Sequence, residues 1–318
     1  MNALERAVLG LKSADAAVRR IAILELLEIS DEDAVVELLL AALEDTDADV
    51  RAEAARALEG FERGEAVEAL LPLLFDPVDD VRRSAASTLA ELKDAELGTR
   101  LLPYASSPDS FVRSTALRAL RELCIPESLA PALDALAADD PAVRREAVSV
   151  LGYLKNPSAL DKLQVVALAD RDPLVRRAAV GALSYASDAR VVATLMRALA
   201  DQWWEVREEA AVTLGRLGFV EAGASLVSAL SDPYWQVRVG SAAALGRLRV
   251  REAVPALSRT LTHEVSNLRK EAARALGEIG DSGAIPSLER AREDPDADVR
   301  KLAALALNKI AGAGFSVR

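Results

Sequence analysis

A Val-Arg or Leu-Arg pair recurs ten times along this chain, at steps of 31 or 32 residues. A Leu stands seven residues after each Arg, and an Ala stands three residues after each Arg except at Ser241. Such self-similarity at a fixed period is typical of a solenoid, in which each unit packs on its neighbours. The pairs are Val18-Arg19, Val50-Arg51, Val81-Arg82, Val112-Arg113, Val143-Arg144, Val175-Arg176, Val206-Arg207, Val237-Arg238, Leu268-Arg269 and Val299-Arg300.

Each repeat predicts two helices. In residues 232–262, Val237, Ala242 and Leu245 keep the spacing of one helical face, and a short helix with Pro255 in its first turn follows a break. Hydrophobic residues make up 51% of the chain and aromatic residues only 4%, which favours closely packed helices over sheets. The predicted fold class is therefore all-α: an α-solenoid of ten two-helix repeats that spans residues 1–318 as a single array, with 312–318 as a C-terminal tail.

Three motifs of one repeat resemble the HEAT-repeat family, in the short bacterial form found in phycobilisome lyases. They are Asp232-Pro233 ahead of Val237-Arg238, the run from Ala242 to Leu248, and the segment from Ala253 to Leu257. The resemblance implies a right-handed superhelix whose concave face is lined by the helices that begin at each Val-Arg pair. It also implies a ladder of Asp–Arg hydrogen bonds between repeats. The ladder Asp is replaced by Ser13, Ser107, Ala138 and His263, where we expect interruptions.

Bulky aromatic residues replace the usual capping Asp in the seventh and eighth repeats. Trp203-Trp204 and Tyr234-Trp235 occupy equivalent positions, and they include all three tryptophans of the chain. We expect Asp201 and Asp232 to take over the capping, and the four aromatic side chains to form one patch at the rim of the concave face. The patch either packs on itself or anchors a partner, because Trp and Tyr are typical of binding hot spots.

A second candidate site lies on the concave face, nine residues after the Arg of repeats five to eight. The residues there are Tyr153, Tyr185, Arg216 and Arg247, and the neighbouring row holds the smaller Ser149, Gly181, Val212 and Ala243. This pattern indicates a groove whose hydroxyls and guanidinium groups bind a carboxylate, a phosphate or an acidic peptide. The alternative is that the long side chains only cover the Ala-rich surface.

Both end repeats place Leu or Ile at positions that are polar or small elsewhere: Ile21, Leu24 and Leu27 in the first repeat, Leu302 and Leu305 in the last. Terminal repeats are normally polar on their outer side. We expect the C-terminal tail to fold back over the last helix. The first repeat remains available to a partner, so the protein is a monomer unless it self-associates through this apolar end.

Charge and cysteine content restrict the function. The net charge is −11, and residues 1–100 alone carry 23 acids against 11 bases, which argues against nucleic-acid binding. The single Cys124, interpreted as a packing residue, excludes an intrachain disulfide and favours a reducing, cytoplasmic location. No apolar run approaches the ~18 residues of a membrane span.

Catalytic signals are weak. His263-Glu264 resembles the His-Glu pairs with which deoxyhypusine hydroxylases, similar in fold, hold two irons, but one His cannot build that site. We therefore predict no catalytic residue, metal or cofactor, and a scaffold or adaptor that binds a protein or peptide. The alternative is a subunit or chaperone resembling bilin lyases that handles a tetrapyrrole pigment.

Overall fold

The computed structural model describes residues 2–186 and 189–315, and the chain divides into two compact units, Met1–Leu154 and Lys155–Arg318. Both units consist of helices, and no strand occurs within the described residues. The predicted all-α solenoid of helix pairs is thus confirmed. That residues 1–318 form a single array stays a prediction.

In the first unit, helices containing a Val-Arg pair alternate with the helices that precede them. Each Val-Arg helix packs on the Val-Arg helix of the next repeat. The Val-Arg helices are α2 (Ala16–Leu26), α4 (Ala48–Ala57), α6 (Asp79–Ala90), α8 (Ser110–Leu120) and α10 (Pro141–Leu154). The other elements are α1 (Ala3–Leu11), α3 (Glu32–Ala42), α5 (Gly64–Leu73), α7 (Ala95–Gly98), η1 (Thr99–Ser106), η2 (Pro126–Ser128) and α9 (Leu129–Ala135).

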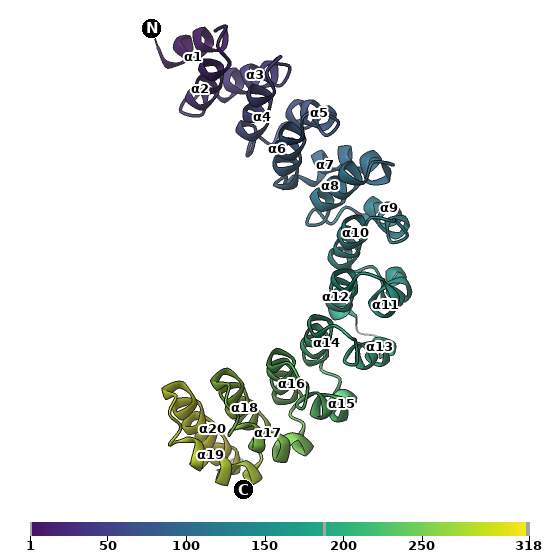
Figure 1. Ribbon diagram of the computed structural model, residues 1–318, viewed down its shortest axis with the longest axis vertical. Helices are drawn as coiled ribbons and strands as arrows, with labels where there is room; N and C mark the ends of the chain where they lie inside the picture. The colour runs from purple at the N-terminus through teal and green to yellow at the C-terminus, as the bar shows by residue number, and fades with distance from the viewer. Residues whose placement is uncertain (1, 187–188, 316–318) are drawn as a thin grey trace. The chain divides into compact units, whose positions relative to one another are not determined.

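The second unit repeats this arrangement, with its Val-Arg helices on one side and the intervening helices on the other (Figure 1). The Val-Arg helices are α12 (Pro173–Ala182), α14 (Trp204–Leu217), α16 (Trp235–Leu248), α18 (Ser266–Ile279) and α20 (Ala297–Phe315). The intervening elements are η3 (Pro157–Ala159), α11 (Leu160–Ala169), η4 (Leu183–Tyr185), α13 (Arg190–Ala198), η5 (Val220–Ala222), α15 (Gly223–Ala229), η6 (Arg251–Ala253), α17 (Val254–Thr260), η7 (Ser282–Ala284) and α19 (Ile285–Ala291).

Side-chain caps fix where many Val-Arg helices begin. Asp172 is the N-cap of α12, and its carboxylate accepts the backbone N–H groups of Leu174 and Val175, with Pro173 as the first helical residue. This order satisfies donors that a helix start leaves unpaired. Asp15, Asp47 and Asp109 cap α2, α4 and α8 in the same way.

Arg–Asp hydrogen bonds link successive repeats, as the resemblance implied. Arg176 binds both carboxylate oxygens of Asp201 at 2.8 and 2.9 Å, and Arg207 binds Asp232 at 2.6 and 2.9 Å. Burial works to raise the pKa of each of these carboxyls, but the Arg and backbone hydrogen bonds overcome it and hold the pKa below its ordinary value. Equivalent pairs are Arg19–Asp45, Arg51–Asp76 and Arg269–Asp294.

The ladder is interrupted where its Asp is missing. Opposite Ser107, Arg82 instead lies over the Phe111 ring, with its Cζ 5.8 Å from the ring centroid. Opposite Ala138, Arg113 donates to the backbone oxygen of Ala105. These interruptions were predicted from the sequence.

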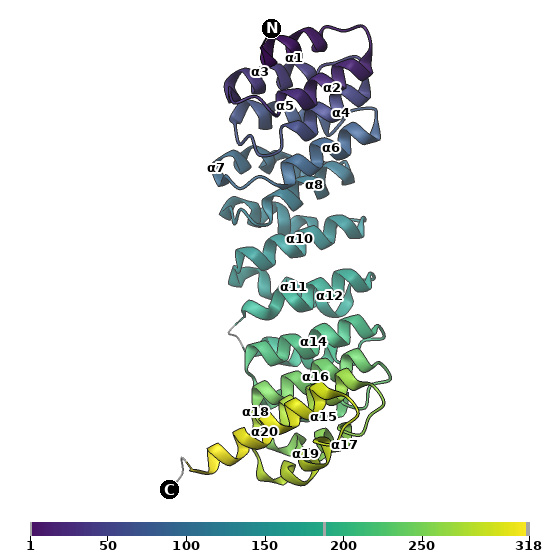
Figure 2. The same ribbon diagram turned by 90° about the vertical axis from the view of Figure 1, so that its left-hand side faces the viewer.

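Glycines let the Val-Arg helices of the second unit approach closely. A Cβ on Gly215, Gly246 or Gly277 would lie 2.8 Å from the Cα of an alanine on the next helix, closer than real Cβ contacts. The alanines are Ala244, Ala275 and Ala306, respectively. Figure 2 shows α14, α16 and α18 side by side, and this backbone-to-backbone packing is the reason for their close spacing.

The C-terminal tail does not fold back over the last helix, as far as the structure describes it. Residues 312–315 continue α20, which runs on toward the C-terminus rather than folding back (Figure 2). No proline ends the helix here, and α20 continues through Gly312 and Gly314 to Phe315. Residues 316–318 lie outside the described part of the chain.

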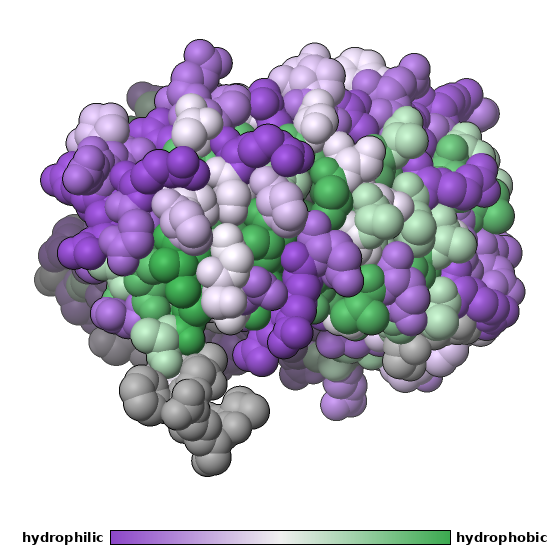
Figure 3. All heavy atoms as spheres, turned by 90° about the horizontal axis from the view of Figure 1, so that it is seen from below, coloured by the Kyte–Doolittle hydropathy of each residue, from purple (hydrophilic) through white to green (hydrophobic). Residues whose placement is uncertain are grey.

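The end repeats expose the apolar residues that the sequence singled out. Ile21, Leu24 and Leu27 are exposed on α2, and Leu305 is exposed on α20, with Leu302 partly buried. Figure 3, which views the protein from the end where α19 and α20 lie, shows apolar side chains between hydrophilic ones. None of the described helices is both long and apolar enough to cross a membrane.

Candidate partner-binding surface

The starts of α14 and α16 bring two of the predicted aromatic residues into contact. The rings of Trp204 and Tyr234 stack with centroids 5.7 Å apart and planes inclined by 15°. The Arg207 guanidinium, already paired with Asp232, lies 5.6 Å from the centroid of the Tyr234 ring. Stacked rings and a cation over a ring are favourable arrangements, so Tyr234 is held in place from two sides.

The same surface leaves large aromatic area in contact with solvent. Trp203 and Tyr234 are each 47% exposed and Trp235 is 39% exposed, whereas Trp204 is partly buried. We call Trp203, Trp204, Tyr234 and Trp235 the aromatic cluster. Part of it packs on itself and part faces solvent, and partner binding by the exposed part stays a prediction.

The expected transfer of capping to Asp201 and Asp232 is wrong. Trp203 and Tyr234 are the N-cap residues of α14 and α16, and neither helix has a side-chain cap. The Asp carboxylates accept the N–H groups of Trp203 and Tyr234 themselves, at 2.9 Å, not those of the first helical turn. Each Asp also binds an Arg of the preceding repeat, and this pairing holds its carboxylate away from the N–H groups of the first helical turn. These two helices therefore lack the side-chain caps that Asp supplies to α12.

Acidic residues missed by sequence reasoning lie beside the aromatic cluster. Glu205, Glu208 and Glu209 occupy the first turns of α14. Glu209 lies 3.6 Å from Arg177, measured from Oε2 to Nε. Burial raises the pKa of Glu208, the nearby Glu209 and Glu205 add to this, and Arg177 works against it. A signal was present in the sequence, since the residue after the repeat Arg is Lys or Arg in six repeats and Glu only at Glu208.

The predicted row of Tyr and Arg side chains is not confined to one unit: one residue belongs to the first unit and three belong to the second. Tyr153 lies on α10 of the first unit, 47% exposed, with the Arg121 guanidinium 5.9 Å from its ring centroid. In the second unit, Arg216 and Arg247 are exposed at the ends of α14 and α16 and form no ion pair within the described residues. These two guanidinium groups are accessible to a ligand.

Tyr185 does not have the free hydroxyl that the groove prediction required. Its hydroxyl donates to the backbone oxygen of Asn156 at 3.1 Å, and burial raises its pKa. The residue lies in η4, where the Val-Arg helix has already ended, so its side chain turns toward the preceding repeat. Tyr185 therefore holds η4 to the loop before α11.

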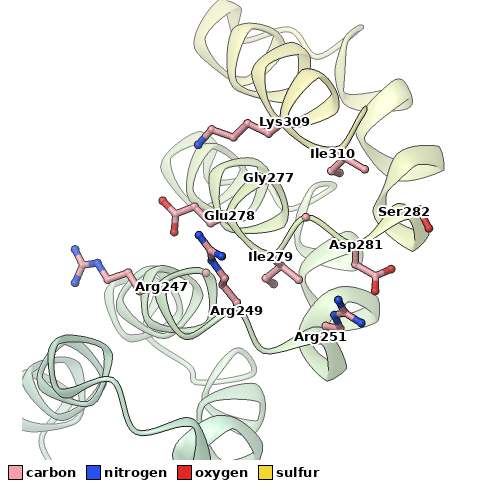
Figure 4. Close-up of a pocket in the computed structure, with 12 residues that line it drawn as sticks. Arg247, Arg249, Arg251, Gly277, Glu278, Ile279, Asp281, Ser282, Lys309 and Ile310 are labelled. Atoms are coloured by element: carbon pink, nitrogen blue, oxygen red, sulfur yellow. The ribbon is translucent and has the colours of Figure 1, made fainter. Parts of the chain in front are cut away.

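A cleft of about 850 Å³ lies at the ends of α16 and α18 in the second unit. Besides Arg247, it is lined by Arg249, Arg251 and Lys309, which the sequence analysis did not select, and by Glu278 and Asp281. In Figure 4, Arg247, Arg249 and Glu278 point into one space, while Arg251 lies near Asp281. The cleft therefore adds Arg249, Arg251 and Lys309 to the exposed cationic side chains near Arg247.

The structure places His263 where the ladder Asp was expected. Its Nε2 lies 2.9 Å from Nη1 of Arg238, and its Nδ1 accepts the N–H of Val265. Within the described residues, no group of three or more His, Cys, Asp and Glu side chains could hold a metal ion.

Cys124, interpreted as a packing residue, is instead exposed. It adopts a left-handed conformation, with φ of 51°, after the end of α8, and its Sγ lies 3.8 Å from the backbone oxygen of Tyr153.

Known structures resemble the chain in fold. An engineered protein is 26% identical, with a TM-score of 0.53, over 98% of this chain and 99% of its own. Kap121p is 15% identical, with a TM-score of 0.67, over 96% of this chain but 41% of its own, so the chain spans less than half of it. The Escherichia coli protein YibA is 19% identical, with a TM-score of 0.53, over 94% of this chain and 99% of its own. No curated protein matches the sequence.

The family model for HEAT repeats matches the sequence from residue 4 to residue 308 in overlapping segments. The segments are 4–90, 36–121, 98–183, 129–215, 165–230 and 223–308. They contain all ten Val-Arg or Leu-Arg pairs, and α20 continues past the last segment to Phe315. The chain is a member of the HEAT-repeat family.

Proposed function

We propose that this protein is a non-enzymatic scaffold or adaptor that binds a protein or peptide partner on the face formed by its Val-Arg helices. One observation carries the proposal: the aromatic cluster keeps Trp203, Tyr234 and Trp235 exposed on adjacent helices. Clustered exposed aromatic residues are typical of binding hot spots. The fold adds support, because solenoid repeats offer long surfaces that suit protein recognition.

The geometry of the cluster suits an anchor. Trp204 and Tyr234 are stacked, so little side-chain freedom remains to be lost when a partner binds. Arg216 and Arg247 lie at the far ends of the same two helices and provide polar contacts for the partner's acidic groups. A segment lying along α14 and α16 would pass over the smaller Val212 and Ala243 between these two regions.

The test uses the exposed tryptophans only. Full-length protein and the double variant Trp203→Ala, Trp235→Ala would be immobilised, and proteins retained from the source lysate would be compared by mass spectrometry. The affinity of each differentially retained protein would then be measured by calorimetry. We expect binding to weaken by more than ~2 kcal/mol, about thirtyfold, because these are hot-spot residues.

Phe75→Ala is the matched control, because Phe75 is also an exposed aromatic residue but lies after α5 in the first unit. It should leave the affinity unchanged. Equal affinity of the double variant and the unchanged protein, both folded by circular dichroism, would contradict the proposed site.

The tetrapyrrole alternative has less support, because the hydroxyl of Tyr185 is already engaged with Asn156. It is tested separately by mixing the protein with a bilin. We expect no shift in the pigment's absorption spectrum. A saturable shift that is lost in a variant with Arg216→Ala and Arg247→Ala would favour pigment handling over the scaffold.

A further inference from the structure

In some repeats the residue that follows the repeat Arg contacts the next Val-Arg helix, whereas Arg83 pairs with Asp79 and Asp80 of its own helix. Lys270, in this position, binds Asp296 at 3.0 Å and Asp298 at 3.1 Å. In the first unit, Arg20 reaches Asp49 and Glu53 of the following repeat in the same manner. A cation on one helix is thus paired with carboxylates on the next.

Glu208 breaks this rule at the aromatic cluster. It occupies the position of Lys270, and the residues matching Asp296 and Asp298 in the next repeat are Tyr234 and Gln236. An acid therefore stands where six other repeats place a cation, and the equivalent positions of the next repeat hold an aromatic residue and an amide in place of two carboxylates. Glu208 is half-buried and has no hydrogen bond or ion pair within the described residues.

Two neighbouring oxygen atoms also lack a partner. Oε2 of Glu205 and Oε1 of Gln236 are buried and accept no hydrogen bond in the described part of the chain. Buried acceptors without donors are unfavourable, and an unpaired carboxylate more so. Arg177, which lies 3.6 Å from Glu209, is the cation that acts on Glu208 from the protein's own side.

We propose that the aromatic cluster and the adjoining Glu205, Glu208 and Gln236 bind an Arg or Lys side chain of a partner's peptide segment. This inference rests on the proposed function and specifies the chemistry of the partner. The exposed rings of Trp203 and Trp235 offer π faces to a cation, whereas the Tyr234 ring is already stacked on Trp204 and lies against Arg207. The carboxylate of Glu208, which is only partly buried and has no hydrogen bond or ion pair within the described residues, offers acceptors to its N–H groups.

Charge complementarity selects a cation over an anion here. Three carboxylates of α14 lie beside the cluster, and one of them, Glu209, is paired with Arg177. Arg207 and Arg176 are neutralised by Asp232 and Asp201 in the ladder, so Arg238, which contacts His263, is the remaining cation at the start of α16. Arg216 and Arg247 stand at the opposite ends of α14 and α16, so they do not compensate the acids at the starts of these helices.

The tryptophans supply the readout. Trp203, Trp204 and Trp235 are the only tryptophans of the chain, so intrinsic fluorescence of the full-length protein reports on this surface alone. The probes are three capped peptides of equal length in which leucines alternate with arginine, glutamine or glutamate. We expect saturable fluorescence quenching by the arginine peptide and at least tenfold weaker binding of the other two.

Variants test whether the acidic residues beside the aromatic cluster bind the arginine peptide. The double variant Glu205→Gln, Glu208→Gln should weaken binding of the arginine peptide at least tenfold. Glu221→Gln with Glu252→Gln is the matched control, because both acids are exposed in η5 and η6, and it should leave binding unchanged. Gln236→Lys would place a cation next to Glu208, as Lys270 lies next to Asp296. It should raise the unfolding midpoint and abolish binding of the arginine peptide.

The outcomes separate this inference from the proposed function. Equal binding of the arginine and glutamine peptides, lost in the variant Trp203→Ala, Trp235→Ala, would overturn the cation preference and leave the aromatic anchor intact. Arginine-peptide binding unaffected by Glu205→Gln, Glu208→Gln would also overturn it, as would no quenching at millimolar peptide. Failure of the proposed function itself shows in the partner-affinity comparison, which does not use these peptides.

Discussion

Arg238 contacts His263 at the position where other Arg residues of the ladder hydrogen-bond to an Asp. Nη1 of Arg238 lies 2.9 Å from Nε2 of His263, while Nδ1 of the same ring accepts the N–H of Val265. A neutral imidazole has one acceptor nitrogen, so both donors cannot be satisfied together. Nε of Arg238 is buried and has no partner in the described part of the chain. This rung is weaker than its neighbours.

Replacing His263 by Asp should therefore stabilise the protein. The carboxylate would accept from Nε and from a terminal nitrogen of Arg238, as Asp294 does for Arg269, and it would still accept the N–H of residue 265. We expect the free energy of unfolding to rise by about 1–2 kcal/mol, since charge-assisted hydrogen bonds are worth about 1.5–3 kcal/mol before the cost of desolvation. Urea unfolding followed by circular dichroism measures the change.

Asp294→His is the matched control, because it converts an intact rung into one like that of His263. It should lower the free energy of unfolding by a comparable amount. If both variants unfold at the same urea concentration as the unchanged protein, the ladder contributes nothing measurable.

Arg249→Gly should also stabilise the second unit. Arg249 ends α16 in the left-handed region, with φ of 53°, at the position where α14 and α18 end with Gly218 and Gly280. Glycine adopts this conformation without a Cβ penalty, so we expect a gain of about 0.5–1 kcal/mol. The measurement is thermal unfolding, and Gly280→Ala is the control, expected to destabilise by about 1 kcal/mol. A destabilised Arg249→Gly variant would mean that the Arg249 side chain itself holds the cleft together.

Gly277→Ala should destabilise the contact between α18 and α20. The added Cβ would lie 2.8 Å from both Cα and Cβ of Ala306, and the backbone atom cannot move aside without displacing the helix. We expect a loss of about 1–3 kcal/mol, as is usual for overpacking. Gly312→Ala is the control, because nothing lies within 4 Å of its added Cβ and alanine favours the helix. Equal stability of the two variants in calorimetry would contradict this close-packing explanation.

Acid should weaken the ladder. The pKa values of Asp45, Asp201, Asp232 and Asp294 are held below their ordinary value, because Arg hydrogen bonds, backbone hydrogen bonds and nearby Arg charges together outweigh the effect of burial. A carboxyl with a lowered pKa in the folded state contributes stability that is present above the unfolded pKa, near 3.9, and is lost as the pH falls through the folded pKa. We expect the unfolding midpoint to drop below about pH 4. In Asp294→Asn the drop should be smaller, and an equal drop would assign acid unfolding to other groups.

The first repeat provides a test of self-association. Ile21 and Leu24 are exposed on α2. We expect a monomer at micromolar concentration and reversible association at higher concentration in sedimentation experiments. Ile21→Lys with Leu24→Glu should abolish that association while leaving helix content unchanged. Association that persists in the variant would place the contact elsewhere.

The sequence by itself determined the repeat and its helices. The spacing of Val, Arg, Ala and Leu fixed the period and the buried faces, because each depends on contacts between equivalent positions of adjacent repeats. The resemblance to HEAT repeats implied the Arg–Asp ladder and its interruptions at Ser107 and Ala138, whereas at His263 the imidazole still contacts Arg238. The repeat pattern also gave the positions of the aromatic cluster. These features follow from local periodicity, which is what a sequence records most directly.

Tertiary structure alone decided which of these side chains remain available. Only the packing shows that the hydroxyl of Tyr185 is bound to Asn156, that Trp204 stacks on Tyr234, and that Asp201 is committed to Arg176 instead of capping α14. It also leaves Glu208 half-buried without a cation, and gathers Arg249, Arg251 and Lys309 from two repeats into one cleft. The physical reason is that the hydrogen-bond partners and solvent exposure of a side chain depend on neighbours about 30 residues away in the sequence, at distances set by the packing of whole helices.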